Sequence, residues 1–128
     1  MTGETAGVVS GDAELLRRAV ENLVRNALRY APEGTAVTIH VSTTVESVHV
    51  SVRDRGPGVP EAALPHLFTP FYRVENDRQR GSGGVGLGLA ISRRAVALHG
   101  GRIAARNASP GLEVKLSLPR RLDDESRK

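Results

Sequence analysis

Residues 81–91 read GSGGVGLGLAI, and five of the eight positions 81–88 are glycine, directly before an apolar segment. Three of these glycines fit the G-x-G-x-x-G spacing of dinucleotide-binding proteins. That motif also needs a preceding strand and an acidic residue about 20 positions later. Segment 75–80 is too polar for a buried strand, and the later region offers Arg106 and Asn107, so the dinucleotide motif is excluded. Glycines at a helix start still leave N–H groups exposed to an anion such as a phosphate.

The composition is that of a single globular domain. A chain of 128 residues can bury about two thirds of its unfolded surface in one core. With 39% hydrophobic and 25% charged residues, it is not a disordered sequence. It has no cysteine, and no apolar run approaches the roughly 20 residues of a membrane helix. The formal charge is +4, but aromatic residues make up only 3%, which argues against nucleic-acid binding.

The sequence predicts two layers, a sheet and a set of helices. Four segments are expected to be strands that pair in two hairpins. They cover residues 37–42, 48–53, 103–106 and 112–118. Asp12 is expected to cap a first helix that ends at Pro32, and a second long helix covers 87–98. This order indicates an α+β fold with helices on one face of the sheet. His40 and His49 fall on polar strand positions and are expected to be surface residues.

The domain itself is expected to cover residues 12–118. Residues 1–11 form an N-terminal segment with a possible first strand, and the charged tail 119–128 is expected to be flexible. Segment 55–84 is irregular, with a short helix expected at 61–67. So long a stretch without a long element is typical of a lid or a binding segment rather than a passive connection.

Three polar residues recur at helical spacing on the first predicted helix. Asn22, Asn26 and Arg29 lie on one narrow stripe beside the apolar face. Asparagine is a mediocre helix former, so two aligned asparagines in mid-helix suggest a task outside the helix. The alternative is an ordinary solvated helix face. A side-chain carbonyl oxygen suits Mg²⁺, which prefers oxygen ligands and keeps several waters.

A second polar motif, DRGPG at 54–58, follows directly after a predicted strand. An ordinary strand-to-turn exit would also contain Asp and Gly. An ionised carboxylate only accepts hydrogen bonds, so Asp54 can receive the amino group of adenine and refuse the keto oxygen of guanine. Gly56 and Gly58 would then let the backbone come close to the base.

Both phenylalanines of the chain, Phe68 and Phe71, lie within segment 67–73. We expect them to pin one end of the long irregular segment. Arg73 and Arg80 on the same segment fit contact with phosphates, although a solvated position fits each of them equally well.

Four stretches in this order resemble the ATP-binding catalytic domain of bacterial sensor histidine kinases, in the GHKL superfamily with the Bergerat fold. The superfamily also includes gyrase B, the MutL repair ATPases and heat-shock chaperone ATPases. The matching stretches are an asparagine box at 22–30, a first glycine box at 54–58, a phenylalanine box at 67–73 and a second glycine box at 84–89. Each box is modest support alone, and their order and spacing over 12–118 make the resemblance specific.

The resemblance implies a mixed five-stranded sheet covered by three helices, with ATP and Mg²⁺ as cofactors. Asn26 would coordinate Mg²⁺, and Asn22 would assist at the metal or the phosphates. Arg29 occupies the position of a family residue that reaches phosphate. Tyr30 would pack on the base.

The resemblance also assigns the two glycine boxes. Asp54 would hold the adenine amino group, with Gly56 and Gly58 beside it. The second glycine box would bring a lid and a helix N-terminus against the triphosphate. Its residues are Gly84, Val85, Gly86, Leu87 and Gly88.

The chain lacks the base that a hydrolytic member of the superfamily uses. In the gyrase and MutL branch, a glutamate four residues before the metal-binding asparagine activates water. That position is Asn22 here, whose amide cannot take a proton at neutral pH, and Glu21 lies about 100° around the helix. A site without its own base suits transfer to a nucleophile supplied elsewhere. In sensor kinases that nucleophile is a histidine on a separate dimerisation and phosphotransfer domain, and a response regulator is the indirect partner.

No histidine of this chain is followed by Glu or Asp, as a family acceptor histidine is. We therefore expect a catalytic fragment of a longer kinase, monomeric and cytoplasmic, whose parent is anchored in the cell membrane. Two alternatives stay open. One is a stand-alone anti-sigma-factor-type regulator that phosphorylates serine on an antagonist protein, and the other is a nucleotide-binding module without activity.

Overall fold

The computed structural model describes residues 11–72 and 87–120. Its elements in chain order are α1 (Ala13–Tyr30), β1 (Thr38–Thr43), β2 (Ser47–Arg53), the 3-10 helix η1 (Glu61–His66), α3 (Gly88–Leu98), β3 (Arg102–Asn107) and β4 (Leu112–Pro119). The four predicted strands, the two long helices and the short helix are therefore all present. Segment 1–10, where a first strand is expected, and the tail 121–128 lie outside the described residues.

The described strands form one antiparallel sheet in the order β1-β2-β4-β3. Its two hairpins, β1–β2 and β3–β4, are the predicted ones. The pairing of β2 with β4 joins them and sets Val52 opposite Val114 and Val50 opposite Leu116. This sheet differs from the expected mixed, five-stranded one. The fifth strand falls in segment 1–10, outside the described residues, so it stays a prediction.

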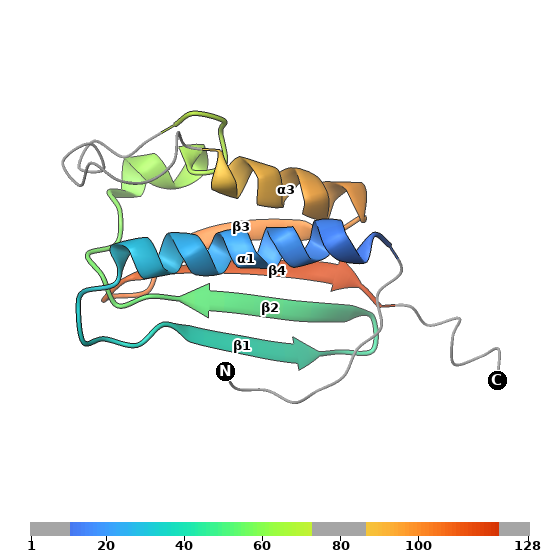
Figure 1. The fold of residues 1–128 in the computed structure, drawn as a ribbon, viewed down its shortest axis with the longest axis horizontal. Helices are drawn as coiled ribbons and strands as arrows, with labels where there is room; N and C mark the ends of the chain where they lie inside the picture. Colours follow the sequence, from blue (N-terminus) through green and yellow to red (C-terminus); the bar gives the residue numbers. More distant parts are fainter. Residues whose placement is uncertain (1–10, 73–86, 121–128) are drawn as a thin grey trace, which may run out of the picture.

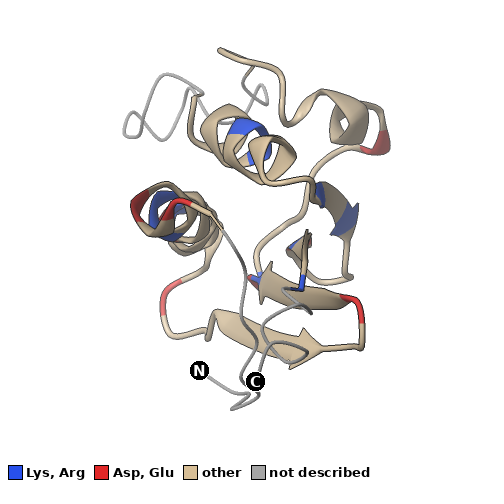
Figure 2. Cartoon of the chain, turned by 90° about the vertical axis from the view of Figure 1, so that its right-hand side faces the viewer, with Lys and Arg blue, Asp and Glu red and all other residues tan. Residues whose placement is uncertain are grey.

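Both α-helices lie on the same face of the sheet (Figures 1 and 2). α1 begins at the predicted cap, where Asp12 Oδ1 accepts a hydrogen bond from the Leu15 N–H at 3.1 Å. It ends before Pro32, because proline lacks the N–H that would continue a helix. The two-layer α+β prediction is thus confirmed. No helix within the described ranges is long and apolar enough to cross a membrane.

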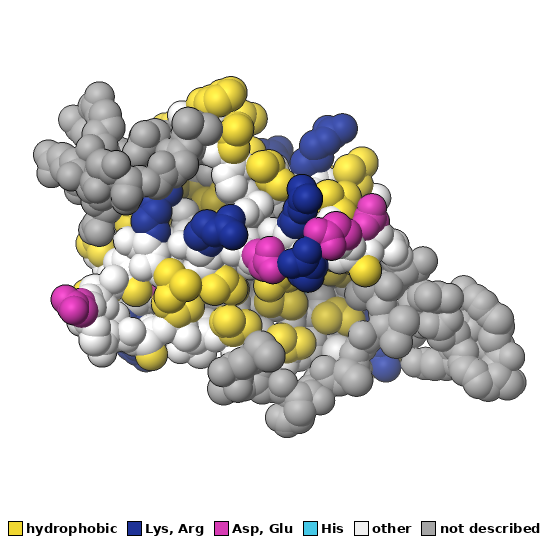
Figure 3. Space-filling model, in the orientation of Figure 1, with side chains coloured by type: hydrophobic (Ala, Val, Ile, Leu, Met, Phe, Trp, Pro, Cys, Tyr) yellow, Lys and Arg dark blue, Asp and Glu magenta, His cyan; other side chains and the backbone are white. Residues whose placement is uncertain are grey.

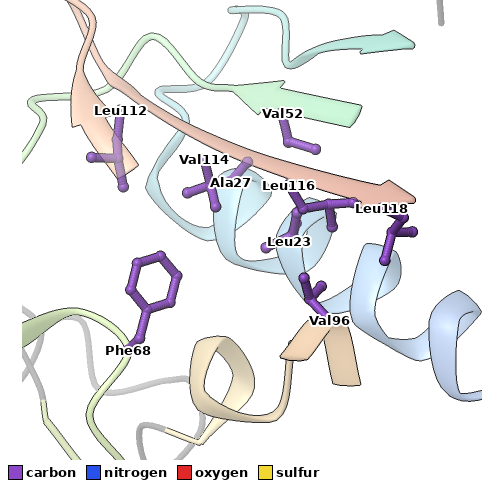
Figure 4. Close-up of a cluster of buried hydrophobic side chains, with 9 residues drawn as sticks. All are labelled: Leu23, Ala27, Val52, Phe68, Val96, Leu112, Val114, Leu116 and Leu118. Carbon is purple, nitrogen blue, oxygen red and sulfur yellow. The ribbon is translucent and has the colours of Figure 1, made fainter. Parts of the chain in front are cut away.

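The core lies between the sheet and the helices (Figure 4). Every second residue of β4 faces it, because side chains alternate along a strand and β4 is covered by helices on one face only. The core side chains are Leu23 and Ala27 from α1, Val52 from β2, Val96 from α3, Leu112, Val114, Leu116 and Leu118 from β4, and Phe68 from the segment after η1.

The prediction for the two phenylalanines is half wrong. Phe68 is buried as predicted, but Phe71 is 66% exposed. Phe71 has a φ of 69°, in a turn that the Tyr72 N–H closes on the Thr69 carbonyl at 3.1 Å. The chain therefore reverses at this point and leaves the Phe71 ring in solvent, so of the two phenylalanines only Phe68 anchors the segment.

The prediction for the two strand histidines is also half wrong. His40 is exposed, as predicted, but His49 is half-buried. Its Nδ1 is buried with no hydrogen-bond partner among the described residues. The reason is position in the sheet: His49 lies on β2 with Ser42 on one side and Ser117 on the other, whereas His40 lies on the outer strand β1.

The outer face of α1 carries charges of both signs (Figure 3). Arg17 contacts Glu14 and Glu21, each at 2.6 Å. The hydrogen bond from Arg17 lowers the pKa of the Glu14 carboxyl. Exposed pairs of this kind contribute little to stability. They do show that part of the arginine content lies on a solvated surface, paired with acidic residues.

We expect Leu116→Ala to lower the free energy of unfolding by about 2–5 kcal/mol, because it leaves a cavity in the core. Leu116 is 1% exposed. Leu98→Ala is the matched control: it deletes the same atoms from a side chain that is 63% exposed, and should change the free energy by less than about 0.5 kcal/mol. Urea unfolding followed by circular dichroism measures both. Equal losses in the two variants would contradict this core.

Candidate functional site

The predicted polar stripe is present on α1. Asn22, Asn26 and Arg29 are half-buried, whereas Glu21 and Arg25 beside them are exposed. Asn22 Oδ1 accepts one long hydrogen bond, from Arg25 Nη1 at 3.4 Å. The structure thus brings the three predicted residues to one side of the helix. Their contacts with metal and phosphate stay predictions.

The last turn of α1 is fixed against the first glycine box. The guanidinium carbon of Arg29 lies 5.5 Å from the centre of the Tyr30 ring, inside the roughly 6 Å range of a cation–π contact. The carbonyl oxygen of Tyr30 packs so closely against Gly56 that a Cβ at Gly56 would collide with it. The stripe and the box therefore share one end of the helix.

The N-terminus of α3 lies beside the other end of the stripe. A Cβ placed on Gly88 would be 3.9 Å from the Cβ and Cγ atoms of Asn22. Among the described residues no side chain caps α3, and its first backbone bond runs from the Ile91 N–H to the Leu87 carbonyl at 2.9 Å. The first N–H groups of a helix have no partner within the helix and suit an anion, which the helix dipole also attracts. Arg73 and residues 84–86 of the predicted site lie outside the described residues.

Two further contacts, which the sequence did not predict, hold α1 and α3 in register. The buried Ser92 hydroxyl donates to the carbonyl of Ala19 at 2.7 Å. At the far end of α3, the Asp12 N–H donates to His99 Nε2 at 2.9 Å. Together with the contact of Gly88 and Asn22, these bonds fix how far α3 slides along α1. They therefore set the position of the α3 N-terminus relative to the asparagines.

Asp54 lies directly after β2 and is only 2% exposed. Its Oδ1 accepts hydrogen bonds from the N–H groups of Gly56 at 2.8 Å and Leu112 at 3.4 Å. Among the described residues, no hydrogen bond reaches its Oδ2. An ionised carboxylate oxygen only accepts hydrogen bonds, so the arrangement suits a ligand that brings its own donor.

Gly56 and Gly58 have packing roles that the sequence did not reveal. Gly58 has a φ of 74°, and a Cβ there would lie 2.6 Å from the Oδ1 of Asn107. At both glycines, protein atoms thus occupy the space that a Cβ would need. These atoms belong to Tyr30 at Gly56 and to Asn107 at Gly58. Their contact with a base stays a prediction.

The β3–β4 hairpin supplies residues that sequence reasoning missed. Gly111 has a φ of 96°, and a Cβ there would collide with the Asp54 carbonyl oxygen. Next to it, the Leu112 carbonyl accepts from the Asp54 N–H at 3.1 Å. Pattern reasoning assigned Gly111 only to a turn, because a contact between segments this far apart in the chain leaves no periodic trace.

A family model described as "Histidine kinase-, DNA gyrase B-, and HSP90-like ATPase" matches residues 11–122, which include every described element. The chain belongs to this ATPase family. Among family members, the sensor histidine kinase CusS of Escherichia coli O157:H7 is 42% identical over 113 residues. That match covers 88% of this chain and 23% of CusS, so the chain spans less than a quarter of this relative.

Solved structures of the same ATPase family have the same fold. The mycobacterial sensor histidine kinase MprB matches with a TM-score of 0.80 and 32% identity, over 88% of this chain and 77% of MprB. The histidine kinase ThkA, in a crystal with the response regulator TrrA, matches with a TM-score of 0.73 and 28% identity, over 90% of this chain and 31% of that one. These similarities identify an ATP-binding catalytic domain of the sensor histidine kinase type.

We expect Gly111→Ala to destabilise the domain by about 3 kcal/mol or more, because it adds a collision with Asp54 to an unfavourable backbone conformation. Gly34→Ala is the matched control. Gly34 has a φ of 85° and no atom within 4 Å of the added Cβ, so it should cost only about 1–2 kcal/mol. Thermal unfolding of both variants measures the difference. A smaller loss for Gly111→Ala than for Gly34→Ala would contradict the close approach to Asp54.

Proposed function

We propose that this domain binds ATP with Mg²⁺ and donates the γ-phosphoryl group to a histidine on a separate dimerisation domain of the parent kinase. The carrying observation is the buried carboxylate of Asp54, fixed through Oδ1, while no donor from the described residues reaches Oδ2. The loop after Asp54 packs against the Tyr30 carbonyl at the C-terminal end of α1, and Asn22 of the asparagine stripe lies beside Gly88 at the start of α3.

Asp54 is the proposed receptor for adenine. Its orientation is set from both sides, by the Gly56 N–H in its own loop and by Leu112 across the sheet. Within the described residues Oδ2 has no donor, and an ionised carboxylate accepts from the amino group of adenine but repels the keto oxygen of guanine. The domain should therefore prefer adenine nucleotides, with the Tyr30 ring nearby at the end of α1.

The asparagine stripe is the proposed site of Mg²⁺ and the phosphates. Asn26 would coordinate the ion through its amide oxygen, and Asn22 would assist. The donor set fits, because Mg²⁺ takes oxygen ligands and completes its shell with waters and substrate phosphates; within the described ranges no cluster of three His, Cys, Asp or Glu residues competes. When bound, the ion neutralises charge on the transferring phosphoryl group. Arg29 and the first N–H groups of α3 would hold the remaining phosphate oxygens.

The site favours transfer over hydrolysis. Asn22 occupies the position of the water-activating glutamate of related ATPases, and an amide cannot accept a proton at neutral pH. Glu21 is no substitute, because its carboxylate is exposed and bonded to Arg17 at 2.6 Å. The domain therefore positions ATP and leaves the nucleophile to a partner.

That partner is the dimerisation and histidine-phosphotransfer domain of the parent protein. His99 of this chain is poorly placed to receive a phosphoryl group, because both of its ring nitrogens are hydrogen-bonded, to the Asp12 N–H and the Ala95 carbonyl. The structure of ThkA contains a response regulator, and we propose a response regulator as the indirect partner here. We also propose a cytoplasmic site of action, with the parent anchored in the membrane, as suits a sensor that phosphorylates a regulator inside the cell.

We expect Asn26→Ala to abolish Mg²⁺-dependent ATP binding without unfolding the domain, because it removes the amide oxygen that would hold the ion. Glu21→Gln is the control on the same helix and should bind ATP like the wild type. Calorimetric titration with Mg²⁺-ATP measures binding, and acid-labile phosphate on an added dimerisation fragment measures transfer. Full phosphotransfer by Asn26→Ala would exclude its proposed role at the metal.

We expect Asp54→Asn to lower ATP affinity by about tenfold to a hundredfold, because Oδ2 becomes a donor that faces the adenine amino group. The amide oxygen can still accept from Gly56 and Leu112, so the loop should keep its shape. Parallel titrations with ATP and GTP measure the effect as a loss of preference for ATP. Equal binding of ATP and GTP by the wild type would overturn adenine recognition by Asp54.

A further inference from the structure

The loop that carries Asp54 is anchored at both ends by one hairpin. Asn107 and Leu112 are opposite each other as the last register pair of β3 and β4. Leu112 binds the start of the loop through its N–H and carbonyl, which meet Asp54 Oδ1 and the Asp54 N–H. Asn107 binds the end of the loop, at Val59. The two ends of loop 54–59 are therefore held by two residues that face each other in the β3–β4 hairpin.

At the end of the loop, the Asn107 side chain pairs with both backbone groups of Val59, as a neighbouring strand would. Its Oδ1 accepts from the Val59 N–H at 2.9 Å, and its Nδ2 donates to the Val59 carbonyl at 2.8 Å. The same Nδ2 lies 3.3 Å from Glu61 Oε2 at the start of η1. A primary amide accepts through its oxygen and donates through its nitrogen without carrying charge. Aspartate at this position could donate neither to the Val59 carbonyl nor to Glu61, and its carboxylate would lie beside these two acceptors.

The backbone before Val59 is shaped to the same side chain. Gly58 adopts a φ of 74°, which disfavours any residue with a Cβ. A Cβ at this position would also lie only 2.6 Å from Asn107 Oδ1. The conformation of the loop and the position of Asn107 thus depend on each other. Loss of the amide would free the end of the loop while Leu112 still held its start.

We infer that Asn107 is a positioning residue for base recognition, acting through Val59 on the loop that presents Asp54. The inference rests on the proposed binding of adenine by Asp54. Asn107 does not touch the base itself. It removes the freedom of the loop before the ligand arrives, and preorganisation of that kind increases affinity for the group that the loop recognises.

The test compares Asn107→Asp, Asn107→Ser and the control Arg106→Gln in the 128-residue chain. Arg106 precedes Asn107 on β3 and is exposed, with one contact to Glu113 at 2.7 Å. Calorimetric titrations with Mg²⁺-ATP and Mg²⁺-GTP give the ATP-to-GTP preference of each variant. We expect Asn107→Asp to lower ATP affinity on the order of tenfold and to narrow the ATP-to-GTP preference, since the hydrogen bonds from Nδ2 to the Val59 carbonyl and to Glu61 are lost. Arg106→Gln should retain both values.

The preference separates positioning from mere stabilisation. A general loss of stability would lower ATP and GTP binding together and leave their ratio unchanged, and that result would overturn the inference. If Asn107→Asp does not fold, the ATP-to-GTP preference of Asn107→Ser tests the inference in the same way. In an Asp54→Asn background, the Asn107 change should no longer alter the preference, because the two act on one contact; full additivity would overturn the inference. A wild type that binds no ATP would overturn the proposed function as well, whereas normal ATP preference in both Asn107 variants would overturn this inference alone.

Discussion

The pairing of β2 with β4 is the constraint on which the rest of the fold depends. It joins two hairpins that are each local in sequence, and it gives β4 the central position from which its alternate residues build the core. Because β2 ends at Arg53 and β4 begins at Leu112, the same pairing brings Asp54 to Leu112. The geometry of the proposed base site is thus a direct continuation of the sheet register.

Most elements of the fold were predictable because their causes are local. The alternation along residues 37–42 and 48–53 and the capped helix after Asp12 each follow from neighbours within a few positions. The stripe of Asn22, Asn26 and Arg29 is likewise a matter of helical spacing. Its identification as a site came from the resemblance to a family, which composition and periodicity alone do not supply.

What escaped prediction depends on residues distant in sequence. Burial of His49 requires strands on both sides of β2, and exposure of Phe71 requires a turn with a positive φ at a residue other than glycine. The contacts that hold the Asp54 loop come from a hairpin about fifty residues further along the chain, where Asn107 and Gly111 look like ordinary turn residues. The contacts of Asn107 with Val59 could not be predicted, because an asparagine beside a turn is common in any sequence.

The positions of two glycines beside α1 link separate parts of the fold. Asn22, in mid-helix, lies beside Gly88, and the Tyr30 carbonyl, at the C-terminal end, packs against Gly56. These two helix residues are eight positions apart, which at about 1.5 Å per residue is roughly 12 Å along the helix axis. The rigid backbone of α1 therefore couples the position of the start of α3 to that of the first glycine box.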